Sequence, residues 1–374
     1  MGHPEVENMT PFAVELLQSS DETGRTLIVP VVKATYDLGS GRQSPLLAVE
    51  QAPVLLTAEH WGAVETSACK YEAETAFYKP ATDVALVGHA YAPRSSPGSS
   101  DVSFQLGALT KRLRVHGERV WYKSGMGITA TAARPFERMP LSYDRAYGGW
   151  DRSSPDERDH HCEMRNPVGL GYRAKKAAFI DDSPLPNVED PAKPLSSYDG
   201  DSAPAGVGFI APNWDPRRSL TGTYDEAWMT ERSPLLPKDF QRSYFNAATP
   251  GLVAQGYLRG DEPFVVRGVR PDGADLTARL PALAAPQCVL RLRGVQRALS
   301  LKTQLDTVIV NSDTNKLFLI WRQSAVVFEG LQGVLDLRIT CDNAPAATEP
   351  PPTAAVISLA ARRATAAKNP VKGR

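Results

Sequence analysis

Three adjacent side chains that can bind metals form the most conspicuous chemical motif of the chain. His160, His161 and Cys162 follow one another within residues 156–163, DERDHHCE. Zinc ligands of structural sites are usually separated by two or more residues, and no second Cys or His pair lies nearby in the sequence. We therefore interpret the segment as a hydrated polar loop, and we expect neither a metal nor a cofactor.

Two kinds of catalytic site can still be assembled from the residue types. Cys69 or Cys162 could pair with a histidine after folding, but no sequence context selects a pair, and free cysteines are commonly small buried residues. Two carboxylates can hydrolyse a glycosidic bond, and Asp225 and Asp239 are candidates. Many of the acidic residues lie beside Arg, Pro or an aromatic residue, which favours roles in capping turns and holding loops. A β-sandwich hydrolase is therefore kept as an alternative to a non-enzymatic role.

Composition gives little support to partners that depend on charge. Among 374 residues, 42 Lys and Arg balance 42 Asp and Glu, so no net charge attracts nucleic acid or an anionic membrane. Walker, dinucleotide-binding, HExxH and GxSxG motifs are absent. The four cysteines, Cys69, Cys162, Cys288 and Cys341, form no CxxC pair, which predicts reduced thiols. No signal peptide is recognisable in residues 1–18, and no apolar run approaches the ~20 residues of a membrane span, so we expect a cytoplasmic protein.

The elements that would position these residues are predicted to be strands. Segments rich in β-branched residues, or alternating between polar and apolar residues, predict strands at 26–37, 83–91, 102–106, 111–117, 263–267, 275–280, 288–293, 301–306, 307–311 and 316–321. Pro30 predicts an edge strand or a bulge, and residues 107–110 a hairpin loop. Short helices are predicted at 224–231 and 354–367. The expected fold class is mainly β, with antiparallel sandwich-like sheets, a large ordered loop-rich lobe and little helix.

The middle third of the chain differs from its flanks. Residues 136–262 are rich in aromatic, Pro, Gly, Asn and Arg residues but show almost no periodicity. A disordered linker would be poor in aromatic residues, so this region is predicted to be an ordered lobe built of loops, which usually serves binding or catalysis. We expect an N-terminal β region at 1–135, this lobe at 136–262, a C-terminal β region at 263–343 and a flexible tail at 344–374.

Trp, Tyr and Arg dominate the energetics of protein interfaces. The candidate partner-binding residues of the lobe are therefore Tyr147, Trp150, Arg165, Asn166, Trp214, Arg217, Tyr224, Trp228, Arg242 and Phe245. For any one of them, a place in the core of the lobe is favoured over a place in an interface, although aromatic side chains bury large areas in either role.

The order of motifs resembles a bacterial family of type VI secretion effector adaptors or chaperones, long labelled a domain of unknown function. The motifs are NMTPF at 8–12, VVKATY at 31–36, FYKPATDV at 77–84, VGHAY at 87–91, PFERMP at 135–140, YGG at 147–149, RNPVG at 165–169, LPN at 185–187 and YLRGDE at 257–262. The resemblance implies a non-catalytic protein that binds a cognate toxin effector and a spike or PAAR-type protein. It carries no catalytic residues over to this chain.

The main hypothesis is therefore an effector adaptor. A strand of the effector is expected to pair with an edge strand such as residues 26–37. A structural component of the secretion spike is a further alternative.

Overall fold

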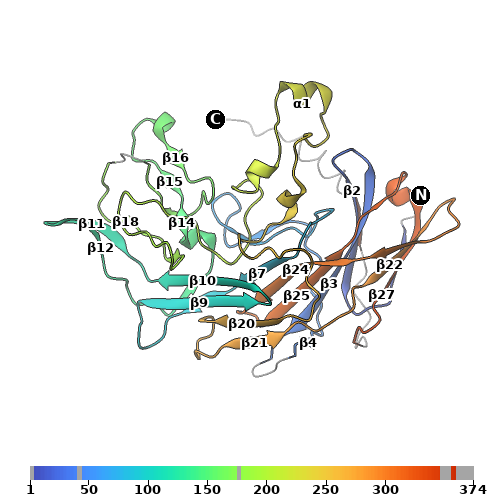
Figure 1. The fold of residues 1–374 in the computed structure, drawn as a ribbon, viewed down its shortest axis with the longest axis horizontal. Helices are drawn as coiled ribbons and strands as arrows, with labels where there is room; N and C mark the ends of the chain where they lie inside the picture. The colour runs from blue at the N-terminus through green and yellow to red at the C-terminus, as the bar shows by residue number, and fades with distance from the viewer. Residues whose placement is uncertain (1–3, 40–43, 175–177, 346–354, 359–374) are drawn as a thin grey trace.

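The structure is a computed structural model, and it describes residues 4–39, 44–174, 178–345 and 355–358. It is mainly β with mostly antiparallel sheets, which confirms the predicted fold class (Figure 1). The largest sheet has the order β28 (Ala355–Ser358), β2 (Ala13–Ser20), β3 (Thr26–Asp37), β25 (Lys316–Arg322), β24 (Gln304–Asn311) and β7 (Asp83–Val87), with β4 (Leu46–Leu47) and β26 (Ala325–Val326) also pairing with β3.

Two further sheets combine strands of the predicted N-terminal and C-terminal β regions. One has the order β19 (Val188–Glu189), β10 (Leu109–His116), β9 (Ser99–Leu106), β20 (Pro263–Arg267) and β21 (Leu276–Arg279). The other has the order β1 (Glu5–Asn8), β27 (Val334–Thr340), β22 (Gln287–Leu292) and β23 (Leu299–Lys302). The predicted N-terminal and C-terminal β regions therefore share sheets.

The middle of the chain is built of loops tied by short strands and single helical turns. Its pairs are β11 (Val120–Ser124) with β12 (Gly127–Ala130) and β18 (Ser183–Pro184), β14 (Tyr147–Gly148) with β17 (Leu170–Gly171), and β15 (Trp150–Asp151) with β16 (His161–Cys162). Nearby pairs are β5 (Glu59–His60) with β6 (Cys69–Tyr71) and β8 (His89–Tyr91) with β13 (Arg138–Pro140). The helical elements are α1 (Glu226–Glu231) and the 3-10 turns η1 (Tyr143–Arg145), η2 (Glu157–Asp159), η3 (Arg218–Leu220), η4 (Arg242–Phe245) and η5 (Gly330–Gly333).

The large sheet is covered on both faces, which explains why β3 is apolar along most of its length. Side chains alternate across a strand, so Ile28 and Val32 enter one core while Val29 and Val31 enter the other. The first core also receives residues from the five-stranded and four-stranded sheets. The second lies under the loops of the middle region and includes Phe209.

Two expectations about β3 have different outcomes. Its predicted bounds are confirmed, but the edge position is wrong, because β3 pairs with β2 on one side and with β25 and β26 on the other. Pro30 is tolerated because β25 pairing ends at Val31 and β26 pairing begins at Ile28. The proline therefore lies at a break in the ladder, where no partner strand needs its missing N–H.

Other boundaries also differ from the predictions. The predicted strand at 83–91 is split at Gly88, where an added Cβ would lie 1.9 Å from Ser312 Oγ. The predicted hairpin loop is shorter, because β9 ends at Leu106 and β10 begins at Leu109. The predicted helix at 354–367 is wrong at 355–358, which form β28, and its other residues lie outside the described residues. Within the described ranges, no helix is long and apolar enough to cross a membrane.

Candidate partner-binding surface

A loop formed by residues 221–241 projects from the body between η3 and η4 and carries α1 at its tip (Figure 1). We call it the projecting loop. Its base is closed where Gln241 N donates to Leu220 O at 3.0 Å and where Asp239 accepts from Thr223 N at 3.0 Å and Thr223 Oγ1 at 2.8 Å. Gly222 adopts φ +82° there, a left-handed conformation that favours glycine. The loop is therefore closed at its base.

The tip of the projecting loop presents aromatic and apolar side chains on an ordered turn. Asp225 caps α1 by accepting from Trp228 N at 2.8 Å, and Trp228 Nε1 donates to Leu235 O at 2.9 Å. The Tyr224 ring packs edge-on against Trp228 at 4.7 Å between centroids. Tyr224 remains 53% exposed and Met229 68% exposed. A rigid, exposed aromatic side chain of this kind suits an interface anchor.

The turn between β2 and β3 fixes the projecting loop to the large sheet. Arg232 Nη2 donates to Glu22 O at 2.6 Å, and Arg232 Nε donates to Leu236 O at 2.8 Å. The Glu22 carboxylate forms an ion pair with Arg242, whose Nε lies 2.9 Å from Glu22 Oε1. The loop therefore has a defined position relative to β2 and β3.

A groove lies beside this anchor, and we call it the Arg242 groove. Its lining residues are Asp21, Arg25, Leu27, Phe77, Tyr78, Arg242, Ser324 and Val326. Arg242 lies over the Tyr78 ring at 5.2 Å from its centroid. A second hollow lies next to the groove and shares Phe77, Tyr78 and Ser324 with it. The groove combines apolar side chains with guanidinium groups, the mixture typical of protein-recognition surfaces.

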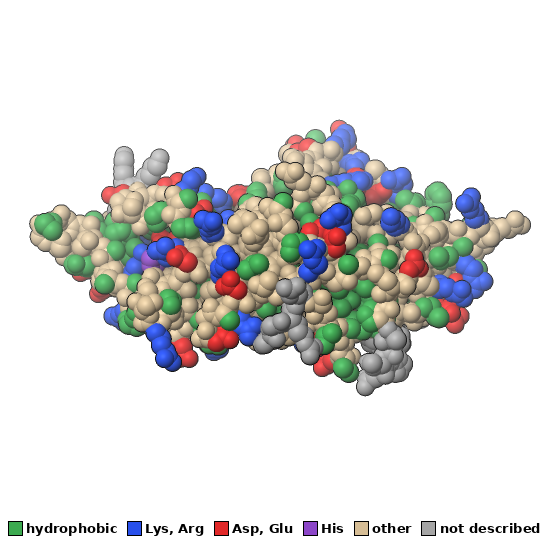
Figure 2. All heavy atoms as spheres, turned by 60° about the horizontal axis from the view of Figure 1, so that its bottom comes forward, with side chains coloured by type: hydrophobic (Ala, Val, Ile, Leu, Met, Phe, Trp, Pro, Cys, Tyr) green, Lys and Arg blue, Asp and Glu red, His purple; other side chains and the backbone are tan. Residues whose placement is uncertain are grey.

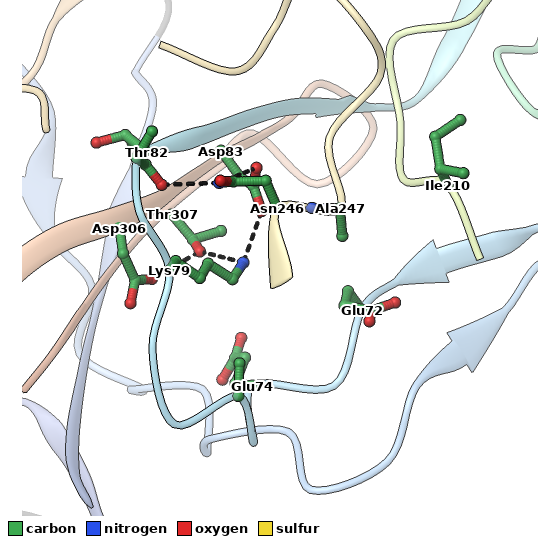
Figure 3. Close-up of polar contacts among 12 residues, drawn as sticks. Glu72, Glu74, Lys79, Thr82, Asp83, Ile210, Asn246, Ala247, Asp306 and Thr307 are labelled. Atoms are coloured by element: carbon green, nitrogen blue, oxygen red, sulfur yellow. Dashed lines mark hydrogen bonds and ion pairs between the residues drawn. The ribbon is translucent and has the colours of Figure 1, made fainter. Parts of the chain in front are cut away.

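A continuous chain of buried polar groups lies behind the second hollow. Asp83 accepts from Lys79 Nζ at 2.7 Å, and Lys79 Nζ also donates to Thr307 Oγ1 at 2.9 Å (Figure 3). Thr307 Oγ1 donates to Asp306 Oδ1 at 2.8 Å, and Asp306 forms a buried ion pair with Arg322. The two carboxylates balance the two cations, so this chain of groups, which we call the buried clamp, carries no net charge. Buried charges persist when they are paired and hydrogen-bonded in this way.

The buried clamp attaches the middle loops to the sheet. Asp83 also accepts from Asn246 Nδ2 and from Ala247 N, both at 2.9 Å (Figure 3). These residues directly follow η4, which carries Arg242 at its start. The β7 strand therefore holds the chain at the end of the projecting loop through a fully buried carboxylate.

Two more buried ion pairs support the same region. Lys33 Nζ lies 2.7 Å from Glu74 Oε1, and Arg217 Nη1 lies 3.0 Å from Glu72 Oε1. Arg217 also donates to Ile210 O at 2.7 Å and to Tyr244 O at 3.0 Å. The guanidinium thereby joins the strand region before β7 to the loops on both sides of the projecting loop.

The carboxylates considered for glycoside hydrolysis take part in local structure. Asp225 caps α1, and the hydrogen bonds from the Thr223 backbone and side chain lower the pKa of Asp239. Burial raises the pKa of Asp21, but hydrogen bonds from Thr23 and Arg25 outweigh this effect and hold the pKa at about 2. These carboxylates have the environment of turn and loop anchors.

The thiols and the metal-capable segment likewise have structural surroundings. Burial, reinforced by Glu72, raises the pKa of Cys69, and burial raises the pKa of Cys288 to about 12. His160 Nε2 contacts Ser154 O at 3.1 Å, and Cys162 pairs with Trp150 between β16 and β15. In the part of the chain that the structure describes, no three His, Cys, Asp or Glu side chains are grouped as metal ligands would be.

The structure does not gather the ten candidate binding residues at one place. Four of them are buried, namely Tyr147, Asn166, Trp214 and Arg217. Three are partly buried, namely Arg165, Trp228 and Phe245. Trp150, Tyr224 and Arg242 are exposed. The projecting loop carries Tyr224 and Trp228, and η4 carries Arg242 and Phe245. Arg217 is buried next to η4, where it donates to Tyr244 O. Tyr147, Trp150, Arg165 and Asn166 lie around β14 to β17, apart from α1 (Figure 1).

The buried members of that list have specific structural tasks. Asn166 Nδ2 donates to Tyr143 O at 2.8 Å and to Tyr147 O at 3.0 Å, which fixes the loops around β14. Trp214 packs edge-on against Tyr143 at 6.0 Å between ring centroids. These two residues act inside the lobe, whereas Tyr224 and Arg242 are available on its surface.

The buried clamp was not predicted from the sequence, and neither was the contribution of Arg25 and Tyr78 to the lining of the Arg242 groove. Charged residues inside apolar strands were the available signal, since Lys33, Asp306 and Arg322 each interrupt or border an apolar run. An apolar strand does not bury a charge without a partner. The partners could not be identified because they lie far apart in the sequence; Lys79 and Thr307 of the clamp, for example, are 228 residues apart.

The fold is mainly β, and loops of the middle region, including the projecting loop, stand on the large sheet. The chain belongs to the bacterial family described as an uncharacterized protein conserved in bacteria (DUF2169), whose model matches residues 23–322. No curated protein and no solved structure matches the chain.

Proposed function

We propose that the protein is a non-catalytic adaptor or chaperone that binds a cognate type VI secretion effector and helps to load it onto the secretion spike. The proposal combines the motif resemblance with family membership over residues 23–322. The observation that carries it is the projecting loop beside the Arg242 groove. There, Tyr224, Met229 and Arg242 are exposed, Arg242 is paired with Glu22, and the buried clamp holds the chain directly after η4.

The surface chemistry suits recognition of a folded or extended polypeptide. Figure 2 shows acidic and basic side chains interspersed over one face, without a dominant sign. Tyr and Arg side chains that are already ordered lose little conformational entropy when a partner binds. Such a surface achieves binding through shape, aromatic contact and guanidinium hydrogen bonds.

The test is capture of the partner from producing cells. The tagged wild-type chain is expected to retain one toxin-like protein together with a spike or PAAR-type protein. Tyr224→Ala combined with Arg242→Ala should reduce the retained effector at least tenfold, since interface anchors each contribute about 1–2 kcal/mol or more. Tyr122→Ala on β11, where Tyr122 is 38% exposed, is the matched control and should retain the effector fully.

Effector stability and delivery supply the second readout. Co-expression with the wild-type chain should raise the soluble amount of the effector and its secretion. Unchanged solubility and secretion, or capture of no toxin-like protein, would contradict the adaptor proposal. Stable incorporation of the chain itself into secreted spikes would favour the structural-component alternative.

A further inference from the structure

The edge of the large sheet is formed by β2 and is partly covered by β28. The two strands pair in parallel from Glu15 with Ala355 to Gln18 with Ser358. Within the residues that the structure describes, β28 therefore pairs with four of the eight residues of β2. The opposite side of β2 pairs with β3 along its full length, from Ala13 to Ser20.

The position of β2 does not depend on β28. Leu16 packs into the first core and Leu17 into the second, and both are completely buried. Full-length antiparallel pairing with β3 and packing on both faces hold the strand rigidly. A strand held in this way presents a fixed row of backbone N–H and C=O groups, which is a template for strand addition.

Several features make β28 an exchangeable occupant of this edge. Its pairing is short and parallel, and parallel pairing is slightly less stable per residue than antiparallel pairing. Because β28 belongs to the same chain as β2, it competes for this edge as an intramolecular ligand. Both β2 and β28 also lie outside residues 23–322, the range that the family model matches.

We propose that the β2 edge is a strand-addition site for the protein partner, and that β28 occupies this site in the unbound chain. The partner supplies an extended segment of at least four residues, rich in Val and Ile like the Ala355-Val-Ile-Ser sequence of β28, in parallel register with Glu15–Gln18. This inference rests on the proposed function and adds a mode of binding to it. Backbone pairing supplies affinity, while the Arg242 groove and the projecting loop supply side-chain contacts.

A synthetic peptide with the sequence of residues 353–362, TAAVISLAAR, probes the edge directly. In the full-length Val356→Pro/Ile357→Pro variant the tethered strand cannot pair, because proline lacks the N–H and disfavours an interior strand position. This variant should bind the peptide at least tenfold more tightly than the wild-type chain. The peptide with prolines at the same two positions is the control and should bind neither chain.

A milder variant, Val356→Gly/Ile357→Gly, guards against misfolding of the proline variant and should show the same direction of change. Equal affinity of the wild-type and variant chains for the peptide would show that β28 does not compete for the edge. Absence of binding to both folded variants would show that β2 accepts no added strand. Either result overturns the proposal.

Site-specific cross-linking separates this proposal from the proposed function. A photoreactive residue replaces Ser20, which is exposed at the end of β2, or Thr110 on β10 as a control. The captured effector should cross-link through position 20 and not through position 110, with a higher yield in the proline variant. An effector that copurifies but never cross-links at position 20 overturns strand addition and leaves the adaptor function intact. Recovery of no effector overturns the adaptor function, and strand addition with it.

Discussion

Removal of the Asp83 carboxylate should be among the most destabilising single changes in the chain. The side chain is completely buried and accepts from Lys79 Nζ at 2.7 Å, and from Asn246 Nδ2 and Ala247 N at 2.9 Å. Breaking a buried ion pair by removing one partner costs about 3–5 kcal/mol, because the other charge stays buried without compensation. Since two further donors also lose their acceptor, we expect Asp83→Ala to lie near the upper limit, at about 5 kcal/mol.

Lys79→Ala should cost less, about 3 kcal/mol, because the Asp83 carboxylate keeps its hydrogen bonds from Asn246 and Ala247. The double variant removes both charges, so its cost should be at least about 2 kcal/mol smaller than the sum of the single costs. Asp101→Ala is a matched control. Asp101 pairs with Arg114 at the surface with a side chain 70% exposed, and its loss should cost less than about 1 kcal/mol.

Urea unfolding of the wild-type chain and the four variants measures these free energies, provided that the denaturant slope stays constant. Hydrogen exchange at the Ala247 amide supplies a local readout, and it should become faster in Asp83→Ala than the global loss of stability requires. Additive costs within about 0.5 kcal/mol in the double variant would refute the coupling between Lys79 and Asp83. A cost below about 1 kcal/mol for Asp83→Ala would refute the clamp itself.

Three further predictions concern the loops and thiols. Gly222→Ala should increase protease cleavage in the projecting loop, because the φ of +82° disfavours alanine and the added Cβ would lie 2.6 Å from a carboxylate oxygen at the loop base. Gly273 is the control: its φ of +75° is similar but the space around it is open, so Gly273→Ala should increase cleavage less. The Asp21 pKa of about 2 lies below the unfolded value of about 3.9, so its stabilisation is complete above pH 4 and is lost as the pH falls toward 2. Asp21→Asn should therefore cost about 1–2 kcal/mol at pH 7 and flatten the acid-induced loss of stability in this range, as measured by urea unfolding at each pH. Burial raises the pKa of Cys288 to about 12 and that of Cys162 to about 11. Alkylation of both thiols in the native chain at pH 8 should therefore be slow, and urea should accelerate it. Rapid labelling of Cys288 in the native chain would contradict its burial.

Strand positions could be predicted because they depend on local patterns. The bounds of β3 and β20 follow directly from runs of β-branched and apolar residues. The pairing of those strands could not be predicted, since the neighbours of β3 come from residues 13–20, 46–47 and 316–326. Pro30 led to a wrong edge assignment because the break between β25 and β26, which accommodates it, is a tertiary feature.

The exposure of the candidate binding residues could not be predicted for a related reason. Aromatic and Arg residues mark the middle lobe in the sequence, but residue type does not distinguish an exposed anchor from a buried one. Tyr224 and Tyr147 have the same side chain, yet Tyr224 is 53% exposed and Tyr147 only 2%. Only the packing of the surrounding loops separates the two roles.

The most direct test of the recognition surface is the affinity of the purified effector for the wild-type chain and for two variants, measured by calorimetry. Tyr224→Ala combined with Arg242→Ala should weaken binding at least tenfold, equivalent to about 1.4 kcal/mol. Arg267→Ala at the end of β20, which removes an exposed ion pair with Asp275, should leave the affinity unchanged. Equal affinity of all three chains would contradict the assignment of the projecting loop and the Arg242 groove as the binding surface.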